Sequence, residues 1–167
     1  MIPDLWRVRR VMFPTLDRVV PERIYGAFVS HTLPREYAGV WDSSPKQIRQ
    51  QLRERPDTYP DNVAAQRVTT DGHALADHAI VTPLYACGSY AYRPDGFFGR
   101  WQLHVRLYAT TDRRTAAFVH WEQNPYVTPH EHLNNIWFDT LVGVERARAR
   151  YDLNSVPLDQ LTFTNEP

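Results

Sequence analysis

Two histidines, His104 and His120, and the single cysteine, Cys87, are the side chains of this sequence best suited to chemistry. Imidazole and thiolate groups bind transition metals, and imidazole also transfers protons near neutral pH. Whether these groups can act together depends on which strands carry them and on how those strands pair. The elements that position them therefore come first.

Residues 100–108 and 115–123 alternate apolar and polar side chains around a polar turn at residues 111–113. Side chains alternate across a strand, so a slip of one residue would exchange its two faces. A turn centred on Asp112 makes every pair on one face apolar: Leu103 with Trp121, Val105 with Val119, and Leu107 with Ala117. A slip would set Leu103 against Glu122, so the sequence predicts the first register.

The dipeptide Asp95-Gly96 is typical of a second tight hairpin, because glycine adopts positive φ without steric cost. A turn centred there predicts that Tyr90 pairs with Trp101, Ala86 with Val105, and Leu84 with Leu107. The apolar face then extends over three strands. The opposite face carries Tyr85, Cys87, Ser89, Gln102, His104, Arg106, Phe118, His120 and Glu122.

In this register Cys87, His104 and His120 form one row across three strands, with neighbouring Cβ atoms about 5 Å apart. Zinc suits these three ligands, and Glu122 or Tyr85 could orient one of them from outside the coordination sphere. For an enzyme, the candidate catalytic residues are His104, His120 and Glu122. For a binding protein, the candidate ligand contacts are Tyr85, Ser89, Gln102, Arg106 and Phe118. The alternative is a polar sheet surface that faces solvent or a partner.

Three other motifs give weaker indications of function than this row does. Cys87 and a histidine could form a nucleophilic pair, but Cys87 lies in an apolar run typical of a buried, inert thiol. The run from His130 to His132 lacks the second histidine of a zinc-protease helix, since position 134 is Asn134. Arginines interleaved with aromatic residues between positions 90 and 108 could stack nucleic-acid bases. The net charge of zero argues against that.

The composition is that of one globular domain spanning residues 1–167, with five Trp, nine Tyr and seven Phe for its core. A single cysteine excludes an internal disulfide framework and favours a reducing compartment. The N-terminal residues lack the apolar run of a signal peptide, and no stretch is long and apolar enough to span a membrane. These features predict a soluble cytoplasmic protein.

The remaining elements are expected from local signals. A helix should begin at Pro45, with Ser44 and Gln47 as its capping box, and end before Pro56. A short helix is expected over residues 34–41 and a loop over residues 55–62. Strands are expected over residues 23–31, 63–70 and 74–82.

One long helix is expected from Pro129 to about Arg150, where apolar residues recur at steps of three and four. This stripe, expected to be buried, comprises Leu133, Ile136, Trp137, Thr140, Leu141, Val144 and Ala147. Gly143 lies inside the helix despite a cost of about 1 kcal/mol relative to Ala. Its presence indicates close approach of a strand or another helix.

Together these elements predict an α+β fold: a curved antiparallel sheet of about five to seven strands with a long C-terminal helix packed on one face. The order resembles that of helix-grip ligand-binding domains in topology alone. Three functions stay open. The first is binding of a small apolar or amphipathic ligand between sheet and helix. The second is an enzyme that uses the Cys87, His104 and His120 row, either without a cofactor or with zinc. The third is a module that docks a protein partner, or a second copy of itself, through the polar sheet face.

Overall fold

The structure is a computed structural model that describes residues 32–61, 86–133 and 137–164. The strands expected over residues 23–31, 63–70 and 74–82, and the residues Leu84 and Tyr85, lie outside this part of the chain. Its elements follow in order: η1 (Pro34–Glu36), β1 (Tyr37–Trp41), α3 (Pro45–Glu54), β2 (Thr58–Pro60), β3 (Gly88–Tyr92), β4 (Trp101–Thr110), β5 (Thr115–Gln123), α4 (Pro129–Leu133), α5 (Thr140–Arg150), η4 (Leu158–Gln160) and β6 (Phe163–Thr164).

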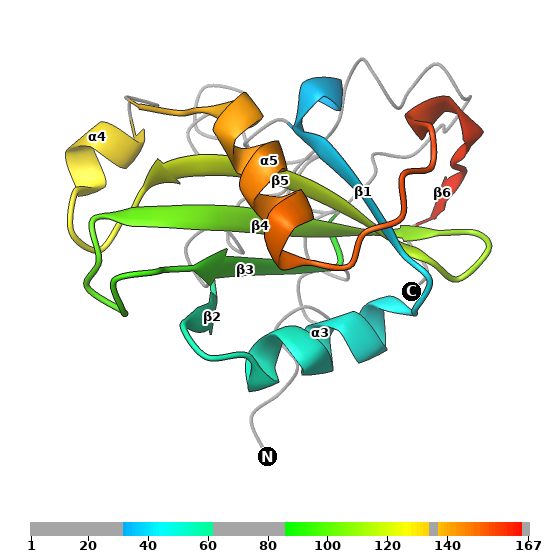
Figure 1. Cartoon of the computed structure of the whole chain (residues 1–167), viewed down its shortest axis with the longest axis horizontal. Helices are drawn as coiled ribbons and strands as arrows, with labels where there is room; N and C mark the ends of the chain where they lie inside the picture. Colours follow the sequence, from blue (N-terminus) through cyan, green and yellow to red (C-terminus); the bar gives the residue numbers. More distant parts are fainter. Residues whose placement is uncertain (1–31, 62–85, 134–136, 165–167) are drawn as a thin grey trace, which may run out of the picture.

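The described strands form one antiparallel sheet of six strands in the order β1-β5-β4-β3-β2, with β6 paired to the end of β4. Helices α3 and α5 pack on the sheet, and α5 crosses it over β5 and β4 (Figure 1). The predicted α+β class with an antiparallel sheet is confirmed. No helix among residues 32–61, 86–133 and 137–164 is long and apolar enough to cross a membrane.

The hairpin of β4 and β5 has the predicted register. Leu103 pairs with Trp121, Val105 with Val119, and Leu107 with Ala117. Tyr90, on β3, lies in the same apolar cluster, which α3 covers with Ile48 and Leu52, and α5 with Val144 and Ala147. The predicted start of α3 is also confirmed, since the Gln47 side chain accepts hydrogen bonds from both the backbone N–H and the hydroxyl of Ser44. One apolar sheet face under two helices is therefore the main core.

The predicted pairing of β3 with β4 is wrong by four residues, because Tyr90 pairs with Val105 and not with Trp101. The connection is longer than a two-residue hairpin. Gly96 N–H donates to the Arg93 carbonyl and Gly99 N–H to the Gly96 carbonyl, which makes two successive turns. An even shift keeps each side chain of β3 on its predicted face.

Cys87 is the exception to this alternation and does not join the histidine row. It lies at a bend just before β3, and its side chain belongs to the apolar cluster under the helices. Its thiol donates to the Leu107 carbonyl at 3.3 Å. Ala91, and not Cys87, is the β3 residue opposite His104.

Two further predictions near the start of the described chain need correction. Residues 34–41 form the short 3₁₀ turn η1 followed by strand β1, and no helix extends over them. The β-branched and aromatic residues of β1 pair with β5, and this sheet pairing outweighs the local helix signal. The loop expected over residues 55–62 contains the three-residue strand β2, which pairs with β3.

The prediction of a C-terminal helix on the sheet is only roughly confirmed: α5 packs there and ends at Arg150 as expected, but α4 and α5 are separate helices and not one. Trp137 has φ +63°, and Asp139 exchanges two backbone hydrogen bonds of 2.8 Å with Trp121 on β5. The Asp139 carboxylate then caps α5 by accepting from Val142 N–H. Of the apolar residues expected to be buried on this helix, Val144 and Ala147 are buried. Trp137 and Leu141 are not, since they are 66% and 69% exposed.

Gly143 is the point at which α5 meets the sheet, as its place in the helix indicated. A Cβ atom at this position would lie 2.5 Å from the Cα of His120 and 2.7 Å from the backbone nitrogen of Trp121. Real Cβ atoms do not approach backbone this closely, so only glycine permits the contact.

We expect Gly143→Ala to lower the free energy of unfolding by about 1–3 kcal/mol, the usual cost of forcing a methyl group into packed backbone. The sign is informative because the same change in an unobstructed helix stabilises by about 1 kcal/mol. Chemical denaturation measures the difference. Glu145→Ala, at an exposed position of the same helix, is the control and should change stability by less than about 0.5 kcal/mol. A Gly143→Ala variant as stable as the parent would show that α5 does not lie this close to β5.

Candidate functional site

A continuous row of polar side chains lies on the sheet face opposite α3 and α5. From β3 through β4 and β5 to η1 it comprises Ser89, His104, His120 and Glu36, which are 1% to 3% exposed. Ser89 Oγ is 2.7 Å from His104 Nε2, His104 Nδ1 is 3.1 Å from His120 Nε2, and His120 Nδ1 is 2.7 Å from Glu36 Oε1. A polar sheet face turned to solvent was one of the expectations, and the burial of this row contradicts it.

The side chain of Glu122 completes a triangle with the two histidines. Its Oε1 lies 3.3 Å from His104 Nδ1, and its Oε2 lies 3.1 Å from His120 Nε2. His104, His120 and Glu122 are the group of potential metal ligands found in the described part of the chain. The two imidazole rings are nearly perpendicular, at 87°, so that one nitrogen of each faces the same small volume as the carboxylate.

In each histidine, the ring nitrogen that points away from the other histidine contacts a buried polar side chain. Glu36 accepts from His120 Nδ1–H, and its other oxygen accepts the N–H of Leu33 within the same turn. His104 Nε2 contacts Ser89, and Asp61 Oδ2 lies 3.4 Å away. A carboxylate behind a ring nitrogen fixes the tautomer and the ring orientation, as it does for metal-binding histidines.

Glu122 is held in the same way by two residues in series. Gln102 Nε2 donates to Glu122 Oε1 at 2.7 Å, and Arg93 Nε donates to Gln102 Oε1 at 2.9 Å. The Arg93 guanidinium is fully buried within about 5 Å of three aromatic rings, those of Tyr59, Phe97 and Tyr126. Cation–π contacts of this kind offset part of the cost of burying the charge.

The surroundings shift the pKa values of the two histidines in opposite directions. Burial lowers the pKa of His104, although Glu122 and Asp61 oppose it. Burial also acts to lower the pKa of His120, but the Glu122 and Glu36 carboxylates outweigh it and leave the pKa raised. Burial would raise the pKa of Glu122, yet the two histidines bring it well below its usual value. Glu122 is therefore an anion whose stability depends on positive charge at the imidazoles.

Among the described residues, the buried network contains more carboxylates than guanidiniums. Its described carboxylates are Glu36, Asp61 and Glu122, and its guanidiniums are Arg93 and Arg106. A positive charge on a histidine, or a bound metal cation, would lower the cost of burying these carboxylates.

The structure brings most of the residues expected from the sequence into this one network. His104, His120, Glu122, Ser89, Gln102 and Arg106 all belong to it; Arg106 donates to Thr32 Oγ1 and lies 3.8 Å from Glu36. Phe118 lies on the same face but in the second apolar cluster, with Tyr108 and Phe163. Cys87 is on the opposite side of the sheet, and Tyr85 lies outside the described residues.

Three residues of the network were missed by sequence reasoning: Glu36, Asp61 and Arg93. Each lies in a turn or connection, where side-chain alternation along a strand gives no information. Glu36 had one usable signal, an acidic residue following Pro34 and Arg35 at the start of a strand. We interpreted that signal as part of the short helix expected over residues 34–41.

Comparisons with models of known protein families, with curated proteins and with solved structures find no match to this chain. The function must therefore be argued from the site itself.

We expect Gln102→Leu to destabilise the protein by about 1–3 kcal/mol, because it leaves buried polar atoms of both Glu122 and Arg93 without their shared partner. The matched control is Gln50→Leu, an exposed glutamine on α3 that bonds only Glu54. It should change stability by less than about 0.5 kcal/mol. Urea denaturation of the three proteins measures both values, and equal effects of the two substitutions would contradict the network.

Proposed function

We propose that this protein is a metal-dependent enzyme in which His104, His120 and Glu122 bind a zinc ion or a similar divalent cation. The observation that carries the proposal is the convergence of four donor atoms. His104 Nδ1 is 3.1 Å from His120 Nε2, and the Glu122 oxygens lie 3.3 Å (Oε1) and 3.1 Å (Oε2) from these two nitrogens. Ligands about 2.1 Å from a metal lie ~3.0 Å apart at right angles and ~3.4 Å apart in a tetrahedron. The three observed separations fall between these two values, and one ligand atom from each residue lies within 4.8 Å of the others, so one ion could contact both imidazoles and the carboxylate.

The chemistry of the donor set supports the same proposal. Two imidazoles and one carboxylate are the ligands of catalytic zinc in several enzyme classes and of the iron in facial-triad oxygenases. His120 Nδ1 donates to a carboxylate, so in the neutral ring Nε2 presents a lone pair to the shared volume. The two Glu122 oxygens present lone pairs there as well, and a cation would satisfy all of them together.

The number of ligands favours catalysis over a purely structural role. Structural zinc sites are closed by four protein ligands, whereas catalytic sites keep a position for water or substrate. Within the described residues the group comprises three ligands. A metal held there would lower the pKa of a bound water to about 7 and make it a nucleophile. The reaction class we propose is therefore metal-assisted hydrolysis or hydration.

The other hypotheses remain open but have less support. A ligand between the sheet and the C-terminal helix needs space, and Gly143 packs directly on the backbone of His120. Docking of a protein partner through the polar face requires exposure, and His104 and His120 are 2% and 1% exposed. A cytoplasmic location and any oligomeric state stay predictions from the sequence.

Metal content of the purified protein tests the proposal directly. We expect about one equivalent of zinc, iron or manganese after exposure to each metal and removal of the excess. His104→Ala, His120→Ala and Glu122→Gln should each reduce the affinity at least tenfold, since each removes one of three ligands. Elemental analysis and calorimetric titration provide the two measurements.

Two controls separate ligand loss from unfolding and from adventitious binding. His130→Ala removes an exposed histidine of α4 and should leave the metal content unchanged. Cys87→Ser tests the cysteine expected from the sequence to be a ligand, and it should also retain the metal because Cys87 lies on the other side of the sheet. Circular dichroism confirms folding of each variant. A folded parent that binds no metal tighter than His120→Ala does would refute the proposal.

A further inference from the structure

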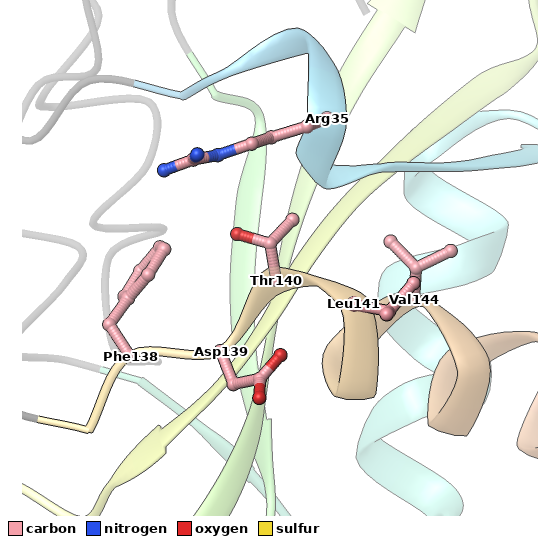
Figure 2. A pocket seen from close by; sticks show the side chains of 6 residues that line it. All are labelled: Arg35, Phe138, Asp139, Thr140, Leu141 and Val144. Atoms are coloured by element: carbon pink, nitrogen blue, oxygen red, sulfur yellow. The ribbon is translucent and has the colours of Figure 1, made fainter.

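An open pocket of about 490 Å³ lies at the start of α5, lined by Arg35, Phe138, Asp139, Thr140, Leu141 and Val144 (Figure 2). Its volume falls within the usual range for small-molecule sites. None of the functional hypotheses drawn from the sequence uses these residues. Its walls nevertheless adjoin the proposed metal site.

Three of the lining residues, or their direct neighbours in sequence, contact His120 or Trp121. The Phe138 ring lies 4.2 Å from the His120 ring, centroid to centroid. Asp139 is paired with Trp121 by two backbone hydrogen bonds. Val144 follows Gly143, which contacts the His120 backbone. The pocket therefore lies beside His120, which is buried behind Phe138.

Element η1 links the pocket to the network through two consecutive residues. Glu36 is buried and hydrogen-bonded to His120, whereas Arg35 is exposed and extends over the pocket above Thr140 (Figure 2). A ligand held by Arg35 would thus lie one residue away from a group that orients the proposed metal ligand.

Charge and shape define the class of ligand. Arg35 is exposed, lines the pocket and forms no ion pair with any residue in the described ranges. The Asp139 carboxylate caps α5 and points away from Arg35 in Figure 2, so it does not neutralise that charge. Phe138, Leu141 and Val144 supply apolar surface beside it. One guanidinium can bind one carboxylate through two parallel hydrogen bonds, and the single positive charge matches a monoanion.

We propose that this pocket binds a small monocarboxylate with an apolar or aromatic body beside His120, one of the proposed metal ligands, with Phe138 between the ligand and the imidazole. The inference rests on the proposed function for the role of the metal, but the carboxylate contact with Arg35 is separate from the three metal ligands. The two can therefore be tested separately.

The probe is phenylacetate, titrated by calorimetry into the full chain, both loaded with zinc and stripped with a chelator. We expect binding to the loaded protein with an affinity at least tenfold above that for phenylacetamide, which has the same body without the charge. Arg35→Gln should weaken phenylacetate binding at least tenfold and leave the zinc content unchanged. Arg53→Gln, which removes an exposed arginine of α3, is the matched control and should bind phenylacetate like the parent.

A second readout locates the ligand relative to the metal. In protein loaded with cobalt(II) in place of zinc, phenylacetate should change the visible absorption spectrum, and Arg35→Gln should require at least ten times more phenylacetate for the same change. An unchanged spectrum would show that the bound ligand does not affect the metal ligand His120 and would overturn its placement beside that residue.

The remaining outcomes distinguish this inference from the proposed function. Zinc binding without discrimination between phenylacetate and phenylacetamide, or equal effects of Arg35→Gln and Arg53→Gln, would overturn the inference alone. Tighter binding of phenylphosphonate than of phenylacetate would overturn the monocarboxylate class. Binding of phenylacetate through Arg35 in a protein that holds no metal would support the carboxylate site and overturn the metal centre.

Discussion

The position of His120 is the constraint on which both faces of the sheet depend. On one face, Gly143 lets α5 approach the backbone of His120 and Trp121 more closely than any other residue would allow. On the other face, the His120 side chain lies between Glu36 and Glu122. Because side chains alternate along a strand, one residue can contact the helix through its backbone and the polar network through its imidazole. Packing of α5 therefore also fixes the site.

The polar network is better explained as a functional site than as a means of stabilising the core. Burial of three carboxylates, two imidazoles and two guanidiniums is expensive, and apolar residues of similar volume would often stabilise a fold equally well. Every histidine nitrogen in the network has a partner, and Glu122 is supported through Gln102 as far as Arg93. Such layers of support hold ligand atoms in fixed positions before a metal arrives, which reduces the cost of binding it.

Element η1 shows how one short turn can serve both the buried network and the surface. Its three residues begin with Pro34, whose fixed φ favours the turn, and end with Glu36, whose carboxylate contacts both Leu33 N–H and His120. Arg35 between them is directed to the pocket beside α5. A change in the position of this turn would alter the orienting carboxylate and the exposed guanidinium together.

The sequence by itself determined the α+β class, the register of β4 with β5, the start of α3 and the close approach at Gly143, because each depends on local periodicity, capping or the absence of a side chain. It also placed His104, His120 and Glu122 on one face, since alternation along paired strands is a local rule. Only the tertiary structure decided that this face is buried, that Cys87 lies on the other side, and that α4 and α5 are separate helices. Glu36, Asp61 and Arg93 reach the site from turns and connections, and only long-range packing determines where such segments lie.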